Sequence, residues 1–225
     1  MDKENIIISL GGSLVAPNEI DTSFLKIFKN VIKKNLKNRR FFIFVGGGKI
    51  SRNYQKALLE FGADNKERDL IGIDVSRLNA RIVKQSFGEL VYSEIITNPT
   101  KRINTKKDIV IAGGWKPGWS TDYCAVVMAK NMGIKTIINL TNTDYVYDKD
   151  PKKFPKAKAF KEIDWKKFRK IIGSKWVPGL SMPFDPRASR DAEILKIKVI
   201  VINGKYLERL ESFLNKKEFI GTLIQ

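Results

Sequence analysis

Three glycine-rich turns contain the residues of this sequence that are best suited to bind a ligand. Each turn follows a short, strongly apolar run, and the turns are Gly11-Gly12-Ser13, Gly46-Gly47-Gly48-Lys49 and Gly113-Gly114. Glycine has no Cβ, so such a turn lets a ligand come close to the backbone. Buried strands of a parallel sheet end at one common edge, and ligands bind along that edge. The turns therefore predict a long polyanionic ligand there, and the alternative is three tight turns that hold no ligand.

The second turn opens a helix that carries two cations. Apolar residues recur at helical spacing between Lys49 and Phe61, so the helix begins at the triple glycine. The free N–H groups and the positive dipole end of that helix form an anion site. Arg52 follows Lys49 at i+3, on the same face of the helix. Lys49 is therefore the candidate catalytic cation, and a solvated residue at the start of a helix is the alternative.

The third turn continues into a shaped loop. Residues 113–122 contain three glycines, a proline, Trp115 and Trp119, and they end in Thr121 and Asp122, where a helix cap belongs. We expect the two tryptophans to line a ligand pocket, because they stand in a loop and not on an amphipathic face. Asp122 is a candidate catalytic residue, and a helix cap is the alternative.

Strands and helices alternate along almost the whole chain. Apolar, β-branched runs predict strands at 6–10, 41–45, 89–92, 109–112, 135–140, 199–202 and 219–224. Helical spacing predicts helices at 22–37, 49–61, 68–86, 165–172, 188–195 and 205–214, one more from Asp122 to Gly133, and loops at 142–155 and 177–186. This order predicts an α/β fold, a three-layer αβα sandwich around an open, mostly parallel twisted sheet. No linker rich in Gly, Ser or Pro divides the chain, so we expect a single domain over 1–225.

The composition limits the class of protein. The 225 residues carry a formal net charge of +18 and include no histidine, which excludes histidine-based catalysis and histidine metal sites. The sequence has no signal peptide, no membrane-spanning apolar run and one cysteine, Cys124, so we expect a cytoplasmic protein without a membrane partner. The lysines lie along amphipathic helix faces, so we do not expect DNA or RNA as the primary partner. The positive charge would still help to collect nucleotides.

Two common phosphate-binding motifs are not present. The Walker A motif needs glycine at position 43 and serine or threonine at position 50, where the sequence has Ile43 and Ile50. The dinucleotide fingerprint needs glycine where Ser51 stands. The glycine turns therefore belong to another kind of phosphate-binding protein.

Six ordered motifs, spread over nearly the whole chain, resemble those of the amino acid kinase superfamily. Within that superfamily the sequence looks most like the uridylate (UMP) kinases of the archaeal type. The motifs are 10–14, 45–49 with Arg52, 69–73, 113–122, 141–147 with Asp150-Pro151, and 184–186. The resemblance implies transfer of the γ-phosphoryl group of ATP to UMP, giving UDP and ADP in pyrimidine nucleotide biosynthesis. It also implies Mg²⁺ bound together with ATP, and it does not identify the protein ligands of the metal. The resemblance further implies a homo-oligomer, which is expected to be a hexamer.

The resemblance assigns residues to both substrates, with the acceptor on the N-terminal part of the domain and ATP on the C-terminal part. UMP is expected at Gly47, Asp69, Trp115, Lys116, Pro117, Gly118, Trp119, Ser120 and Thr121, with Asp69 on the ribose hydroxyls. ATP is expected at Gly11, Gly12, Ser13, Gly48, Arg52, Thr141, Asn142, Asp144, Tyr147 and Asp150. The expected catalytic residues are Lys49, Asp122 and Asp185, since phosphoryl transfer needs mainly positioning and charge neutralisation. Core packing for Tyr147 and an Asp-Pro turn for Asp185 are the alternatives.

The sequence departs from the superfamily pattern at Ser9, Tyr145, Trp115 and Trp119. Many members have lysine at the position of Ser9, so the charge of that lysine must come from elsewhere. Two other functions stay open: a kinase of the same fold for another small acid or phosphate, and a non-catalytic nucleotide-binding or storage protein. The isopentenyl-phosphate branch is disfavoured, because it is expected to use a histidine.

Overall fold

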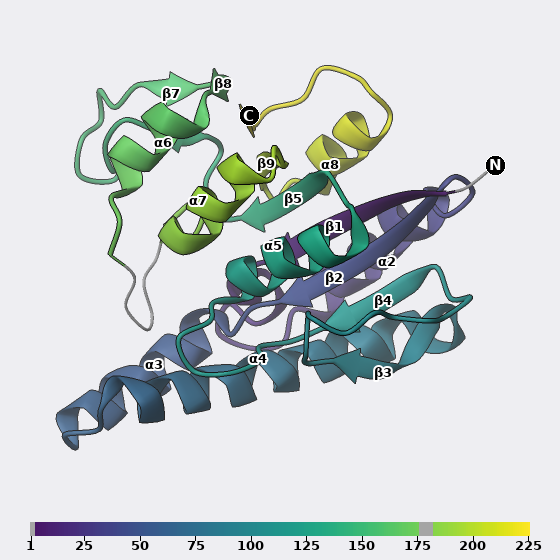
Figure 1. Ribbon diagram of the computed structural model, residues 1–225, viewed down its shortest axis with the longest axis horizontal. Helices are drawn as coiled ribbons and strands as arrows, with labels where there is room; N and C mark the ends of the chain where they lie inside the picture. Colours follow the sequence, from purple (N-terminus) through teal and green to yellow (C-terminus); the bar gives the residue numbers. More distant parts are fainter. Residues whose placement is uncertain (1–2, 176–181) are drawn as a thin grey trace.

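The fold is built on an eight-stranded, mostly parallel sheet. We describe it from a computed structural model that covers residues 3–175 and 182–225 (Figure 1). The strand order is β3-β4-β2-β1-β5-β9-β10-β8, and within it only the β9–β10 pair is antiparallel. The strands are β1 (Glu4–Leu10), β2 (Arg39–Val45), β3 (Val91–Ile96), β4 (Ile109–Ala112), β5 (Thr136–Thr141), β8 (Glu162–Ile163), β9 (Lys198–Asn203) and β10 (Thr222–Ile224). The parallel α/β sheet predicted from the sequence is confirmed.

The central strands are buried on both faces. Residues 6–10, 41–45, 109–112 and 199–202 are all buried, in agreement with their nearly continuous apolar sequences. Two polar exceptions, Ser9 and Asn139, lie at the same register position of neighbouring strands β1 and β5. Polar side chains therefore enter the core near the carboxyl ends of the strands.

Helices cover the sheet on two sides, which gives the three expected layers (Figure 1). One layer contains α2 (Thr22–Lys34), the second half of α4 (Asn65–Phe87) and α8 (Leu207–Leu214). The other contains α5 (Thr121–Met132), α6 (Trp165–Ile172) and α7 (Pro186–Ile194). The helix α3 (Gly48–Glu60) packs on α4, and this helix pair extends beyond the sheet.

Several boundaries differ from the sequence prediction. The predicted strand at 89–92 begins instead as a 3₁₀ turn, η1 (Gly88–Leu90), because Gly88 has a φ of +59° and ends α4 there. The predicted strand at 219–224 is shortened to β10. The predicted loop at 142–155 contains β6 (Val146–Tyr147), which pairs with β7 (Ala159–Phe160). Of the predicted loop at 177–186, residues 177–181 lie outside the described residues.

The first glycine turn also adopts a conformation that its sequence did not predict. Residues Gly12–Val15 form a short helix, α1, directly after β1. In the part of the chain that the structure describes, no helix is both long enough and apolar enough to cross a membrane.

Candidate active site

The first two glycine turns pack directly against each other at the carboxyl edge of the sheet. The Gly46 N–H donates to the Leu10 carbonyl at 2.9 Å. A Cβ on Gly12 would lie 2.2 Å from the Gly46 carbonyl oxygen, and a Cβ on Gly48 would lie 2.4 Å from the Ser13 nitrogen. These glycines are therefore needed for the contact between the turns, whether or not a ligand is present.

Two of the predicted cations gather with Ser13 at the N-terminus of α3. The Lys49 backbone N–H donates to Ser13 Oγ at 3.0 Å, and Arg52 Nη2 donates to the same oxygen at 3.3 Å. Lys49 Nζ donates to Asn18 Oδ1 at 2.7 Å, from an exposed position. Burial lowers the pKa of Arg52 from its usual value, although the guanidinium remains charged. The Ser13 hydroxyl, the Arg52 guanidinium and the N-terminal N–H groups of α3 thus meet at one point, which suits an anionic group, while the Lys49 ammonium lies at Asn18.

A small cavity of about 160 Å³ opens beside this point, between α3, α4 and the loop before α5. Asp69 lines it, and Asp69 Oδ2 accepts a hydrogen bond from the Gly118 N–H at 2.6 Å. Burial raises the pKa of Asp69, while the Gly118 hydrogen bond and Arg68 oppose the shift. The cavity is lined by Gly47, Gly48, Ser51, Arg52, Gln55, Asp69, Gly72, Ile73, Ser76, Gly114, Trp119, Ser120 and Thr121.

The cavity brings together five of the residues expected to bind the acceptor. They are Gly47, Asp69, Trp119, Ser120 and Thr121, while Gly118 is linked through its hydrogen bond to Asp69. Trp115, Lys116 and Pro117 are not among the lining residues that the structure describes. The loop therefore meets the cavity mainly with its second half.

Three polar residues of α4 hold the glycine turns, and the sequence analysis missed them. Ser76 Oγ accepts from the Gly114 N–H at 2.8 Å, and Arg77 Nε donates to the Gly114 carbonyl at 3.0 Å. Asn79 Nδ2 donates to the Gly46 carbonyl at 2.9 Å. The one available signal was the presence of polar residues between apolar ones on a helix that packs against the sheet. These side chains fix the second and third turns to one helix.

Three aromatic rings next to the cavity contact one another edge-on or at a tilt, and two cations lie against them. The ring centroids of Trp115 and Trp119 are 4.6 Å apart, and those of Trp119 and Tyr123 are 4.4 Å apart. Lys116 Nζ lies 4.2 Å from the Trp115 centroid, and Arg187 Cζ lies 4.0 Å from that of Tyr123. Edge-to-face and cation–π contacts of this kind restrict the Trp119 ring, which lines the cavity.

Asp122 forms a buried polar cluster with Ser9 and Asp185. Ser9 Oγ donates to Asp122 Oδ1 at 2.7 Å, and the Asp185 N–H reaches Asp122 Oδ2 at 3.3 Å. Burial raises the pKa of Asp122 to about 6; the Ser9 hydrogen bond opposes the shift and the negative charge of Asp185 adds to it. The cap of α5 is Ser120, whose Oγ accepts from the Tyr123 N–H. The alternative of a plain cap for Asp122 is therefore wrong, and its carboxylate faces the end of β1.

Asp185 itself caps α7 and borders a second, cationic hollow. Its Oδ1 accepts from the Ala188 N–H at 2.7 Å, and burial raises the pKa of its carboxyl. The hollow, of about 760 Å³, is lined by Gly118, Ser120, Tyr123, Arg169, Lys170, Gly173, Ser174, Asp185, Pro186, Arg187 and Arg190. Its four cations come from helix faces that the sequence alone describes as solvated, so their convergence depends on how α6 packs against α7.

The residues expected to bind ATP fall into two groups. Gly11 and Thr141 are neighbours, because the Gly11 N–H donates to the carbonyl of Leu140 at 2.9 Å. Asp144 Oδ1 instead accepts from Asn203 Nδ2 at 2.9 Å and from Arg209 Nη1 at 2.6 Å, and these bonds lower its pKa. The Asp144 carboxylate thus fixes the loop after β5 to the start of α8. Asn142 and Asp150 are exposed, and Tyr147 is half-buried on β6.

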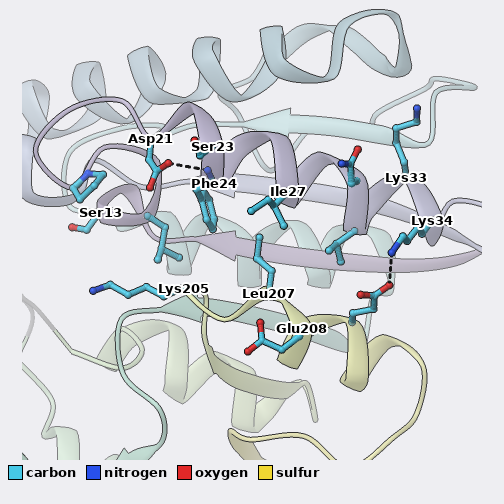
Figure 2. A pocket seen from close by; sticks show the side chains of 15 residues that line it. Ser13, Asp21, Ser23, Phe24, Ile27, Lys33, Lys34, Lys205, Leu207 and Glu208 are labelled. Carbon is cyan, nitrogen blue, oxygen red and sulfur yellow. Dashed lines mark hydrogen bonds and ion pairs between the residues drawn. The ribbon is translucent and has the colours of Figure 1, made fainter.

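A groove of about 1000 Å³ extends from the first turn between α2 and α8. Figure 2 shows Ser13 and Lys205 toward one end and the ion pair of Lys34 with Glu211 at the other, where Nζ and Oε1 are 3.0 Å apart. Apolar side chains, among them Phe24 and Ile27, line its middle. Lys205 thus adds a cation beside the first glycine turn.

Comparisons with known proteins agree with this architecture. The model of the Amino acid kinase family matches residues 4–203. A uridylate kinase of Methanospirillum hungatei is 35% identical over 222 residues, which cover 97% of this chain and 94% of that protein. A uridylate kinase of Pyrococcus abyssi is 31% identical and is matched over 98% of this chain and 99% of its own length. The crystal structure of a uridylate kinase from Archaeoglobus fulgidus superposes with a TM-score of 0.83 at 30% identity, over 98% of this chain and 99% of that one. The chain therefore belongs to the amino acid kinase family.

Proposed function

We propose that this protein is a UMP kinase, which transfers the γ-phosphoryl group of ATP to UMP and releases UDP and ADP. The observation that carries the proposal is the cavity between α3 and α4, where Asp69 stands close to a glycine turn and a helix N-terminus. The helix N-terminus suits a phosphate, and the carboxylate suits ribose hydroxyls. Relatives named uridylate kinase, which align over nearly the whole chain, support the same reaction.

The residues take three roles in this proposal. Gly47, Asp69 and the 115–121 loop bind UMP. Gly11, Gly12, Ser13, Gly48, Arg52, Thr141, Asn142, Asp144, Tyr147 and Asp150 bind or position ATP. Lys49, Asp122 and Asp185 act at the transferred group, Lys49 by neutralising its charge. Asp144 would act indirectly, since Asn203 and Arg209 already occupy its carboxylate.

We propose that Mg²⁺ enters with ATP. Within residues 3–175 and 182–225, no three His, Cys, Asp or Glu side chains lie close enough together to hold a metal by themselves. This fits a cation that the phosphates carry, because Mg²⁺ in such sites is held by one or two carboxylates together with substrate phosphates and water. Bound there, the cation would neutralise charge on the β- and γ-phosphates.

We also propose that the chain works in the cytoplasm as a homo-oligomer, with a hexamer as the expected form. The helix pair α3–α4 carries the exposed apolar side chains Tyr54, Leu59, Leu70 and Leu78, and Phe61 directly follows α3. Exposed apolar groups of this kind mark contact surfaces in soluble proteins.

A coupled assay of ADP release over a panel of nucleoside monophosphates, with ATP and Mg²⁺, tests the function. We expect UMP to give the highest kcat/KM of the panel. Release of ADP with another acceptor but not with UMP would transfer the proposal to that acceptor. If no acceptor gives ADP although nucleotides bind, the protein is a non-catalytic binder.

A further inference from the structure

Gln55 is a buried polar residue of the acceptor cavity to which the sequence analysis gave no role. Its side chain lies on α3, is 5% exposed and lines the cavity together with Asp69. Nε2 donates a hydrogen bond to the Arg68 carbonyl at 3.0 Å. Oε1 is buried, and no group in the described part of the chain donates a hydrogen bond to it.

A buried carbonyl without a donor costs free energy, so its presence needs a reason. The bond of Nε2 to the Arg68 carbonyl links α3 to α4 and accounts for the amide nitrogen, but it gives the carbonyl oxygen no partner. The terminal torsion of glutamine is broad, so a modest rotation moves the amide within the cavity. A ligand that brings a hydrogen-bond donor into the cavity would remove the cost.

The position of Gln55 along α3 indicates which part of the ligand it meets. Gln55 follows Arg52 at i+3, and both line the cavity, so Gln55 lies about one helical turn, or ~5 Å, beyond the end of the cavity where, in the proposed reaction, the acceptor phosphate meets the γ-phosphoryl group of ATP. In a nucleoside monophosphate, the group next to the phosphate is the ribose. Asp69 lines the same cavity from α4, so a carboxylate and an amide carbonyl without a donor face the cavity as a pair of acceptors. The vicinal hydroxyls of ribose are two donors, and they match this pair.

We infer that Gln55 is a specificity-determining residue whose side-chain carbonyl accepts a hydrogen bond from a ribose hydroxyl of the acceptor nucleotide. Together with Asp69 it selects ribonucleotides over deoxyribonucleotides. The inference rests on the proposed phosphorylation of UMP. A deoxynucleotide would leave Oε1 without its donor, and a site built to bond a hydroxyl discriminates against the analogue that lacks it.

The test compares kcat/KM for UMP, 2′-deoxy-UMP and 3′-deoxy-UMP in three forms of the full chain. Gln55→Met keeps the length of the side chain but removes both polar atoms. Gln55→Glu keeps an acceptor oxygen and removes the Nε2 donor to Arg68. Thermal unfolding of both variants establishes that they are folded, and Lys56→Met, at the next position of α3 and exposed, is the matched control.

We expect the wild type to prefer UMP over at least one of the two deoxy analogues. Gln55→Met should reduce that preference about tenfold, as expected for loss of one well-placed hydrogen bond, and Gln55→Glu should retain it. Equal loss of kcat/KM for all three nucleotides in Gln55→Met would leave only a structural role and overturn the inference. No turnover of UMP by the wild type would instead overturn the proposed function, and the inference with it.

Discussion

At the scale of single residues, the first feature to explain is the negative charge of the buried Asp122 carboxylate. Among the described residues, no lysine or arginine forms an ion pair with Asp122, although Asp185 lies beside it. The hydroxyl of Ser9 stands where many superfamily members have lysine, and it donates to Asp122. The predictions at this scale concern two residues. Ser9 donates a hydrogen bond to Asp122, and Lys49 is the candidate catalytic cation.

Ser9→Ala should move the acidic limb of the kcat–pH profile to higher pH. The Ser9 O–H stabilises the ionised form of Asp122, so its removal raises the pKa of Asp122 further above its present value of about 6. Two other titratable groups lie near it. Burial also raises the pKa of the Asp185 carboxyl, and the thiol of Cys124 is uncharged. If the ionised carboxylate is needed, Ser9→Ala should lose more activity at pH 6 than at pH 8.

The profile is measured in steady state between pH 5 and pH 9, at saturating ATP and UMP. Ser86→Ala is the control, because Ser86 Oγ bonds only a carbonyl of its own helix, that of Val83 at 2.7 Å. Superimposable profiles for Ser9→Ala and Ser86→Ala would show that Ser9 does not tune the Asp122 carboxylate.

Lys49→Ala should lower kcat by about 10²-fold or more, with a smaller effect on the KM for UMP. Loss of one well-placed electrostatic stabiliser has this magnitude. Lys49→Arg should rescue only in part, since a planar guanidinium differs from a compact ammonium. Asn18→Ala removes the partner of Lys49 Nζ and should change kcat by no more than a few-fold. A Lys49→Ala enzyme within a few-fold of the wild type would assign the charge to Arg52 or to Mg²⁺.

At the scale of elements, the helix α4 positions one side of the cavity that Asp69 lines. It carries Asp69 near its start and, about two to three turns later, Ser76, Arg77 and Asn79, which hold two glycine turns. Its last turns pack on the sheet, with Val83 and Phe87 in the core. One helix therefore links the sheet, the turns and the Asp69 carboxylate.

Arg77→Ala should raise the KM for UMP about tenfold and leave the KM for ATP nearly unchanged. The guanidinium holds the third turn through the carbonyls of Gly114 and Trp115, at 3.0 and 2.9 Å, and bonds to a charged group contribute about 1.5–3 kcal/mol each. Without them the loop that carries Trp119 loses its fixed position. Arg81→Ala, one turn later and exposed, is the control in the same kinetic assay. Equal increases in both KM values would mean a general loss of structure.

At the scale of the whole molecule, the surface combines a large positive charge with several exposed apolar side chains. The net charge of +18 is spread over helix faces and includes the cations of the hollow beside α7. A positive field of this kind raises the local concentration of nucleotides and speeds their association. Several of the large exposed apolar side chains lie on or next to α3 and α4, where Phe61 is 87% and Leu78 60% exposed.

Replacing Leu59 and Phe61 by glutamate should lower the oligomeric state. These side chains are exposed on the projecting helix pair, so burying them in a contact between copies would be favourable, and two added charges would prevent it. Size-exclusion chromatography with light scattering gives the mass directly. Ile194→Glu, which alters an exposed apolar residue on α7, is the control. A wild-type protein that is monomeric at micromolar concentration, or a double variant of unchanged mass, would contradict the prediction.

Patterns that are local in the sequence determined the fold and the edge of the sheet at which the glycine turns lie. Apolar runs such as 41–45 and 109–112 predict buried strands, and glycines after them predict turns, because burial and backbone torsion angles follow from neighbouring residues. The i+3 relation of Lys49 and Arg52 is also local. The tertiary structure brings these two to a common contact, Ser13.

Only the tertiary structure decided which distant side chains meet. Ser9 and Asp122 are 113 positions apart, and their hydrogen bond exists because β1 lies beside β5 in the sheet and α5 begins above β1. The unpaired carbonyl of Gln55 likewise depends on how α3 packs against α4. A periodic pattern reports which face of an element is buried, but not which element covers that face. Pairings between elements follow from strand order and helix packing, and these are properties of the assembled chain.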